Sequence, residues 1–409
     1  MRNNHFTPRQ REVSTTALKR WNFLGGAVRS GKTYLTFWLW LKEVKSCDGP
    51  FLLTGKTLGT LKRNVLDPMR DLFGSEIVGE MRSNATIEIV GKKHYIICAN
   101  DESSVERLQG SSYARAYGDE VTTWPESYFR MLQSRLDKPG ARFIGTYNPE
   151  GPYHWLKTSF IDKADTLNAN VFSFHIDDNT FLDPDFVAAL KMEYTGIWYD
   201  RYILGLWAAA EGLIYDMFTD AHIFTSLPPN VRVLREWAPL DYGTQNAFVA
   251  LIVAQCSDGI YRVMKEYRWD GRESRQQKTD SQYADELDDF ITDYGRIPQA
   301  YIPDPSAASF ITELKVITPR RKHHIPVKPA NNSVLDGIRR VASLFATDRI
   351  HIHESCVGLI NECRSYAWDN ETGKRTGIDT PFKEHDHGPD ALRYWAYTCT
   401  NASGIIVVS

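Results

Sequence analysis

The stretch GAVRSGKT at residues 26–33 decides the fold of the first half of the chain, because it matches the phosphate-loop pattern G-x-x-x-x-G-K-[ST]. An apolar, strand-like run over residues 22–28 leads into it, and a helical pattern continues past it to Glu43. In such a loop, glycines turn backbone N–H groups toward phosphate, and the following helix adds its positive N-terminal dipole. Lys32 would meet the β- and γ-phosphate oxygens, and Thr33 would bind Mg²⁺. The stretch therefore predicts a nucleotide site, which also includes Gly26, Ser30 and Gly31.

Two polar residues near this loop are further candidates for contacts with the nucleotide. Arg29 lies inside the loop and could reach the γ-phosphate, although an arginine there can also be a solvent-exposed loop residue. Gln10 lies about sixteen residues before the loop, where its side-chain amide could read the adenine edge through a paired donor and acceptor. We predict ATP with Mg²⁺ as the bound species and count both residues among its contacts.

Hydrolysis also needs acidic and amide groups at the carboxyl edge of the sheet. The pair Asp119-Glu120 follows a short strand-like run that is less apolar than usual because it contains Arg115. We predict that Asp119 holds Mg²⁺ and that Glu120 orients the attacking water. Asn148 ends an apolar strand, where an amide could sense the loss of the γ-phosphate. The plainer interpretation of Asn148, taken alone, is a turn-forming Asn-Pro.

Composition and length are typical of a soluble protein with more than one domain. The chain has 409 residues, 42% of them hydrophobic, and shows no signal peptide and no apolar run of about 18 residues. Its six cysteines are scattered without a C-x-x-C pair, which argues against a disulfide framework or a zinc site. With a net charge of −3, nucleic-acid contact would depend on local basic clusters, such as Lys56, Lys62 and Arg63 or residues 320–324. We therefore expect a cytosolic protein.

Two series of alternating strands and helices predict an α/β fold in two domains. The first series has expected strands over residues 22–28, 51–54, 86–90, 94–98 and 142–147. The second has expected strands over residues 237–241, 248–254, 261–267, 300–303 and 349–353, with helices over 282–293 and 334–346. Gly212 and the pair Pro228-Pro229 mark a turn-rich connection between them. We predict domains at residues 1–208 and 231–409, joined by a linker at residues 209–230.

Three acids of the second half share one chemistry. Asp241 and Asp304 each end an expected strand, and Asp390 lies in the first turn of a helix that begins near Pro389. Strand-borne and helix-borne acids that converge describe a ribonuclease-H-like site. Because clustered carboxylates repel one another unless cations neutralise them, we expect two Mg²⁺ or Mn²⁺ ions, roughly 4 Å apart, that serve phosphodiester hydrolysis. His387 is a further candidate ligand and Asp386 a weaker one, although each acid alone is more often a cap or turn residue.

Four segments together resemble the large terminase subunits of tailed bacteriophages. They are residues 25–33, residues 108–111 leading to 118–120, residues 145–149 followed by 151–155, and the run DHGPDALRY at residues 386–394. Their order and spacing extend over nearly the whole chain. The resemblance implies an N-terminal phosphate-loop ATPase domain of the additional-strand type and a C-terminal ribonuclease-H-like nuclease domain.

The resemblance also implies roles for single residues. It assigns Lys32 and Thr33 to the nucleotide and Mg²⁺, Asp119 to the metal, Glu120 to the attacking water and Asn148 to coupling. It makes the nuclease triad of Asp241, Asp304 and Asp390, with His387 beside them. A trans-acting arginine should exist in a ring of such subunits, and the sequence does not choose among Arg107, Arg115, Arg130 and Arg135.

The setting of the protein follows from the same resemblance. Family members assemble as a ring, usually a pentamer, on the portal protein of an empty procapsid, and a small terminase subunit selects the double-stranded DNA. The expected activities are ATP-driven DNA translocation and endonucleolytic cleavage of the concatemer. The expected place is the host cytoplasm, docked transiently on the procapsid and without a membrane.

Two other hypotheses share parts of this pattern. A cellular phosphate-loop DNA helicase or repair ATPase would have a second motor domain, but no second nucleotide motif follows Gly151. Alternatively, the C-terminal acids are inert and that half serves only to dock on the portal. Binding of divalent metal by the second half would separate a nuclease from a docking module.

Overall fold

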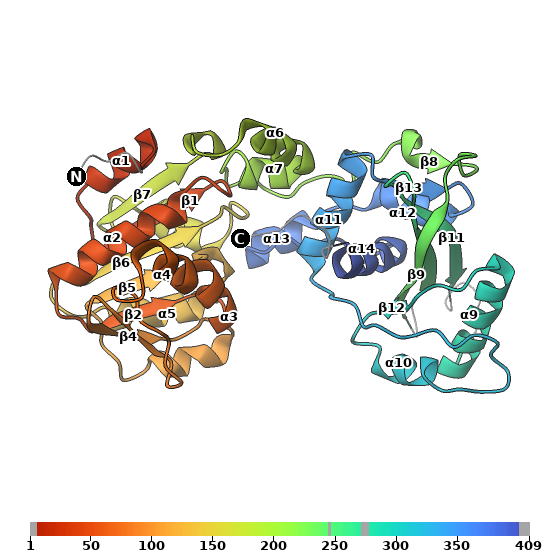
Figure 1. Cartoon of the computed structure of the whole chain (residues 1–409), viewed down its shortest axis with the longest axis horizontal. Coiled ribbons are helices and arrows are strands. Elements are labelled where there is room, and N and C mark those ends of the chain that lie inside the picture. The colour runs from red at the N-terminus through yellow and green to blue at the C-terminus, as the bar shows by residue number, and fades with distance from the viewer. Residues whose placement is uncertain (1–5, 244–246, 271–277, 401–409) are drawn as a thin grey trace.

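The computed structural model of the chain describes residues 6–243, 247–270 and 278–400. It contains two sheets in two lobes, which stand side by side in Figure 1 with the N-terminal lobe on the left. The strands of the first sheet fall between residues 21 and 174, and those of the second between residues 223 and 353. The α/β class predicted from the sequence is confirmed.

The first lobe is built from short elements in alternation. Its helices and strands are α1 (Pro8–Thr15), β1 (Trp21–Gly26), α2 (Lys32–Ser46), β2 (Phe51–Thr54), α3 (Leu58–Leu61), η1 (Lys62–Leu66), α4 (Asp67–Phe73), β3 (Thr86–Ile89), β4 (Lys92–Ile96), η2 (Glu102–Leu108), β5 (Arg115–Gly118), η3 (Val121–Thr123), α5 (Glu126–Arg135), β6 (Arg142–Tyr147), η4 (Lys157–Ile161), β7 (Ala169–Phe174), η5 (Ile176–Asp178), α6 (Pro184–Glu193) and α7 (Gly196–Tyr202).

The second lobe has longer strands, which form its centre. Its elements are η6 (Asp220–His222), β8 (Ile223–Phe224), β9 (Val233–Asp241), β10 (Phe248–Cys256), β11 (Tyr261–Trp269), α9 (Asp280–Tyr294), β12 (Tyr301–Pro303), α10 (Ala308–Leu314), α11 (Val334–Ala346), β13 (Ile350–His353), α12 (Val357–Ser365), α13 (Asn370–Thr376) and α14 (His387–Cys399).

The first sheet has the strand order β3-β4-β2-β5-β6-β1-β7. All pairs are parallel except β3 with β4, so the carboxyl ends of β1, β5 and β6 meet at one edge. Strand β1 is buried along its whole length because neighbouring side chains enter opposite cores. Leu24 packs in the core that contains α2, and Phe23 packs in the core that contains α5. A parallel sheet covered on both faces explains why its strands read as apolar runs.

Strand β5 carries an arginine in a fully buried position, and a distant acid explains how the strand tolerates it. The Arg115 side chain is 9% exposed, and its Nε donates to Glu43 Oε2 of α2 at 2.5 Å. Arg142 of β6 pairs with the same carboxylate at 3.0 Å. A buried charge needs such a partner to offset its lost hydration. Arg115 is therefore a structural residue of the first lobe.

The second sheet has the strand order β12-β9-β10-β11-β13-β8. In the central strand β10, alternate side chains enter different cores, as the two-residue period of a strand requires. Val249 and Leu251 pack with α11, α12 and α14 on one face, whereas Ala250 and Ile252 pack with α9 and α10 on the other. The sheet is thus covered by helices on both faces.

Some elements differ from those predicted. Strands β7 and β8 had no sequence prediction, and β4 runs over Lys92–Ile96 instead of residues 94–98. The predicted linker at residues 209–230 contributes Ile214, Tyr215 and Phe218 to the core of the second lobe, where each is at most 8% exposed. Its turn-forming glycine and prolines are visible in the sequence, whereas the packing of its apolar residues depends on the tertiary fold. The division into two domains remains a prediction.

Candidate functional site: a nucleotide cleft and a carboxylate site

A cleft of about 810 Å³ lies at the carboxyl ends of β1, β5 and β6. The phosphate loop forms one wall, and the residues that follow β5 and β6 form the opposite wall. Many of the predicted nucleotide residues line it together, namely Arg29, Ser30, Gly31, Lys32, Thr33, Asp119, Glu120 and Asn148. Residues predicted from three separate segments therefore share one cleft.

The loop depends on backbone conformations that favour glycine. Gly31, with φ of 83°, caps the N-terminus of α2 in the left-handed region. Gly26 ends β1 with φ of 131°, and a Cβ atom there would lie 2.0 Å from the Phe174 carbonyl oxygen. A side chain at Gly26 would therefore separate β1 from β7. Gly26 shapes the start of the loop, while the residues after it line the cleft.

Lys32 connects the loop to the end of β6. Its Nζ donates to Asn148 Oδ1 at 2.7 Å and to the Ala27 carbonyl at 3.0 Å. Burial lowers the pKa of Lys32 to about 8, and the charges of Asp119 and Glu120 oppose that shift. The two residues predicted to bind and sense the γ-phosphate, Lys32 and Asn148, are thus in direct contact.

The acidic pair after β5 is held in place by Thr146 of β6. Thr146 Oγ1 donates to Asp119 Oδ1 at 2.8 Å and accepts from the Glu120 backbone N–H at 3.1 Å. Burial raises the pKa of Asp119, while the Thr146 hydrogen bond and the charge of Lys32 work against the increase. The sequence prediction missed Thr146. Its position on β6, two residues before Asn148, is a signal that could have identified it.

Gln10 and Arg29 differ from the other candidates in their contacts. The Gln10 amide is 3% exposed, accepts from the Thr7 backbone N–H at 2.9 Å and donates to the Gly31 carbonyl at 2.8 Å. It therefore completes a capping box on α1 and holds the phosphate loop through the Gly31 carbonyl. Arg29 is exposed, with φ of 56°, and its carbonyl accepts from Asn179 Nδ2 at 2.7 Å. Adenine recognition by Gln10 and phosphate contact by Arg29 remain predictions.

In the second lobe, the predicted acids gather at one end of the sheet. Strand β12 pairs in parallel with β9, with Pro303 beside Leu240. Asp241, the last residue of β9, and Asp304, the residue after β12, therefore lie at neighbouring strand ends. Helix α14 packs against β9 and β10 and carries Asp390 and His387 in its first turn. The His387 Nδ1 and Asp241 Oδ2 atoms are 2.9 Å apart.

Each of these acids also has a partner within the chain. Tyr394 donates to Asp304 Oδ2 at 2.6 Å, and Arg393 donates to Asp390 Oδ1 at 2.7 Å. The ammonium of Lys383 lies 3.5 Å from Asp390 and 3.3 Å from Asp386. The sequence prediction assigned no polar role to Arg393, Tyr394 or Lys383. All three lie within a few residues of Asp390, but the sequence does not show their side-chain directions.

The charges of this carboxylate site favour a cation. The pKa of Asp241 is raised to about 6, mainly by burial; the hydrogen bond with His387 opposes the increase, and the neighbouring Asp390 and Asp386 contribute to it. Carboxylate oxygens with an imidazole are donors that suit Mg²⁺ or Mn²⁺. Within the described ranges, however, no three His, Cys, Asp or Glu side chains converge closely enough to hold an ion. The residues therefore fit a divalent cation in chemistry, and the structure does not show a closed ligand sphere.

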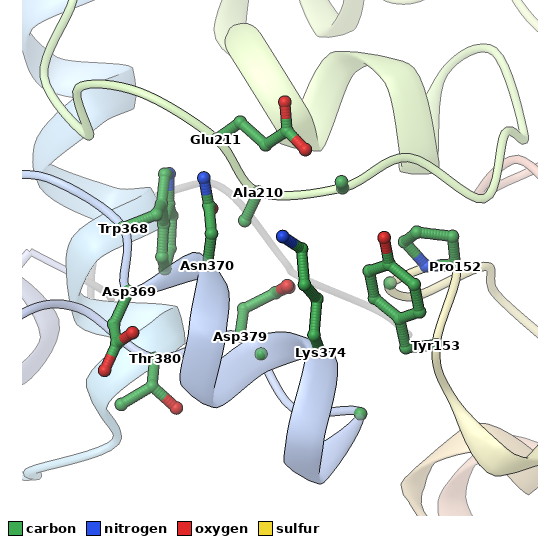
Figure 2. A pocket seen from close by; sticks show the side chains of 14 residues that line it. Pro152, Tyr153, Ala210, Glu211, Trp368, Asp369, Asn370, Lys374, Asp379 and Thr380 are labelled. Carbon is green, nitrogen blue, oxygen red and sulfur yellow. The ribbon is translucent and has the colours of Figure 1, made fainter.

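A second cavity of about 350 Å³ lies at the seam between the lobes. In Figure 2, Tyr153 from the segment after β6 faces Lys374 of α13, with Glu211 above them. Beside this cavity, Arg201 of α7 pairs with Glu150 at 3.4 Å and with Asp379 of the second lobe. The seam therefore begins two residues after Asn148 in the chain.

Several residues of the two basic clusters predicted as DNA contacts form ion pairs with acids of the same chain. Lys62 pairs with Asp67 at 2.6 Å. In the run at residues 320–324, Arg321 pairs with Asp285 and Glu313, and His323 contacts Asp288 at 3.0 Å. Arg321 and His323 are therefore structural residues.

No helix within the described ranges is long and apolar enough to cross a membrane.

These observations define the class: an α/β protein with a phosphate-loop nucleotide cleft and a second lobe that gathers carboxylates. A family described as terminase large subunit, T4likevirus-type, N-terminal, matches residues 23–219. The chain is 25% identical over 283 residues to the large terminase subunit of Escherichia phage T5, a match that spans 66% of this chain and 61% of that protein.

Solved structures of the large terminase from a thermophilic bacteriophage are similar over almost the whole chain. One is 36% identical, with a TM-score of 0.85, and covers 96% of this chain and 98% of the other. Structures of the same terminase in complex with ADP and with ATP-γ-S are 35% and 34% identical, each with a TM-score of 0.84 and covering 97% of this chain and 99% of the other. The chain belongs to the large terminase subunits, the family of phage DNA packaging, and the resemblance noted in its sequence is confirmed.

Proposed function

We propose that the first lobe hydrolyses ATP with Mg²⁺ and that this hydrolysis drives double-stranded DNA into a procapsid. The observation that carries the proposal is the single cleft in which Lys32, Asp119 and Asn148 meet. Its support from relatives is the large terminase of the thermophilic bacteriophage, whose structures contain ADP and ATP-γ-S.

Each residue of the cleft has a role that its position allows. Lys32 neutralises the β- and γ-phosphates, and Thr33 with Asp119 holds the Mg²⁺ that supplies charge neutralisation to the phosphates. Glu120, half-buried at the cleft wall, orients the attacking water. Asn148 accepts a hydrogen bond from Lys32, so loss of the γ-phosphate, which changes the charge beside Lys32, would alter the contact of Lys32 with Asn148. The additional-strand type of this domain is part of the same proposal.

For the second lobe we propose a ribonuclease-H-like nuclease that uses Mg²⁺ or Mn²⁺. Asp241, Asp304 and Asp390, with His387, would hold two ions, which supply an activated water and stabilise the leaving oxygen. The support is the placement of Asp241 and Asp304 on neighbouring strand ends beside the first turn of α14. The raised pKa of Asp241, caused by burial and by neighbouring acids, indicates a site that a cation would stabilise.

The wider setting is proposed from family membership. A small terminase subunit would select the DNA, and a ring of large subunits, a pentamer by family resemblance, would act on the portal protein in the host cytoplasm. A helicase or repair ATPase is set aside, because the chain belongs to the terminase family along almost its full length. An inert docking role for the second lobe is the alternative that experiment must exclude.

Plasmid cleavage by the full-length protein tests the nuclease assignment. Wild-type protein with Mg²⁺ or Mn²⁺ should cut the plasmid, and the Asp241→Ala variant should not, while both hydrolyse ATP at the same rate. Equal cleavage by both proteins would mean a contaminating nuclease or a different site. The absence of cleavage and of bound Mn²⁺ in wild-type protein would favour the docking alternative.

A further inference from the structure

Two consecutive side chains of α14 lie beneath the proposed nuclease acids. Arg393 and Tyr394 follow Asp390 by three and four residues, so all three occupy the same side of the helix. Arg393 is 3% exposed and Tyr394 is 2% exposed. A buried guanidinium and a buried phenol need polar partners, and both find them among the proposed metal ligands.

Tyr394 and two other donors fix the carboxylate of Asp304. The Tyr394 hydroxyl donates to Asp304 Oδ2 at 2.6 Å. On the other oxygen, Asp304 Oδ1 accepts from the Ser306 backbone N–H at 2.8 Å and from Asn332 Nδ2 at 3.3 Å. The Ser306 side chain is a further hydrogen-bond partner of Asp304. Together these donors orient the carboxylate.

Arg393 connects this arrangement to Asp390. Its Nε donates to Asp390 Oδ1 at 2.7 Å, and its Nη1 donates to the Asn332 carbonyl at 3.1 Å. Its guanidinium carbon lies 4.4 Å from the centre of the Tyr394 ring, and its Nη2 is 3.4 Å from the Tyr394 hydroxyl. One buried pair thus contacts both the acid that directly follows β12 and the acid in the first turn of α14.

We propose that Tyr394, supported by Arg393, is a positioning residue that orients Asp304 for a divalent cation. The inference rests on the proposed nuclease function and deepens it. Hydrogen bonds to metal-binding carboxylates reduce the reorganisation that binding requires, and their loss typically weakens metal affinity by about 10–100-fold. A purely structural Tyr394 would affect folding and leave the affinity of the folded protein for metal unchanged.

The test compares Tyr394→Phe with Tyr397→Phe in the full-length protein. Tyr397 lies three residues further along α14, and its hydroxyl donates to Asp336, which is not one of the proposed ligands, at 3.2 Å. Mn²⁺ binding is measured by calorimetry, and plasmid cleavage is measured as a function of Mn²⁺ concentration. We expect Tyr394→Phe to weaken Mn²⁺ binding by about tenfold or more. The cleavage rate at saturating Mn²⁺ should change much less, and Tyr397→Phe should match the wild-type protein.

Several outcomes would decide against the inference. Wild-type Mn²⁺ affinity in Tyr394→Phe would overturn it, and so would an equal loss in Tyr397→Phe. The ATPase rate and the melting temperature report whether each variant is folded. If Tyr394→Phe does not fold, Asn332→Ala is the second variant, because Asn332 is exposed and also donates a hydrogen bond to Asp304. This variant should also weaken Mn²⁺ binding. An unchanged Mn²⁺ affinity in Asn332→Ala overturns the inference. Absence of both Mn²⁺ binding and cleavage in wild-type protein would instead refute the nuclease proposal itself.

Discussion

The nucleotide cleft and the carboxylate site place their charges in opposite ways. In the cleft, the positive charge is a side chain of the protein, the ammonium group of Lys32, which lies near Asp119, Glu120 and Asn148. In the carboxylate site, Asp241 and Asp390 repel each other, and burial raises the pKa of Asp241 to about 6. The first site contains a lysine ammonium and can bind an anion. The second site contains several carboxylates, and a cation bound from solution would neutralise them. The two lobes therefore suit two different chemistries.

Removing one charged residue from each site tests whether the two sites work independently. Lys32→Ala should reduce ATP hydrolysis by about 10³-fold or more, because the phosphates lose their neutralising cation. Plasmid cleavage by the same variant should remain near the wild-type rate. Asp304→Ala should do the reverse, abolishing cleavage while leaving ATP hydrolysis intact. Both activities are measured on each full-length variant.

Folding controls make this crossed test decisive. Asp304→Asn keeps the side-chain size and should behave like Asp304→Ala, because a neutral amide is a poor ligand for Mg²⁺. Circular dichroism and melting temperature show whether each variant is folded. Loss of both activities in either folded variant would contradict two independent sites.

A smaller effect is expected at the buried ion pair beneath β5. Glu43→Gln should destabilise the protein by about 3 kcal/mol, since Arg115 would stay buried without an opposite charge. Arg142→Gln is the matched control, because Arg142 is 37% exposed and Glu43 would keep Arg115 as a partner. We expect that change to cost about 1 kcal/mol or less. Denaturant unfolding of both variants measures the difference, and equal costs would show that Arg115 can be hydrated.

The sequence predicts local features of both lobes well and long-range partners poorly. The phosphate loop and the strands at residues 51–54 and 142–147 follow from contiguous patterns, and the structure has them. The partner of Arg115 is 72 residues away, and that of Asp241 is 146 residues away, so neither contact is visible in the sequence. Local rules were also overlooked, since the T-x-x-Q spacing of Thr7 and Gln10 indicates the capping box that the structure contains.

The carboxylate site illustrates the limit of prediction from sequence in physical terms. The strand ends at Asp241 and Asp304 can be read from their apolar runs, and parallel pairing brings them together. The contact of Tyr394 with Asp304 crosses 90 residues and depends on how α14 is rotated against the sheet. A tyrosine on an apolar helix face indicates a core residue, and only the tertiary fold shows where its hydroxyl lies.

The seam between the lobes offers the smallest effect and depends on pH. Glu150 lies two residues after Asn148 and pairs with Arg201, which also contacts Asp379 across the seam. The pKa of Glu150 is raised to about 7, mainly by burial; Arg201 opposes the increase and Asp379 contributes to it. Since the pKa in the folded protein exceeds the ordinary value of 4.5, the stability that Glu150 contributes is full below pH 4.5 and is lost as the pH rises through about 7.

Glu150→Gln removes this titration and keeps the size of the side chain. The stability of the variant relative to wild type should therefore increase between pH 5 and pH 8, because only the wild-type protein then carries a poorly hydrated carboxylate. The side chain keeps 26% of its surface exposed, so solvent screens the charge and we expect on the order of 1 kcal/mol. Denaturant unfolding of both proteins at several pH values measures it. The stability difference could instead stay constant with pH, or favour the wild-type protein more at pH 8 than at pH 5. Either result would mean that Arg201 already stabilises the ionised carboxylate of Glu150. The seam, like the nucleotide cleft, would then neutralise its acid with a basic side chain of the protein.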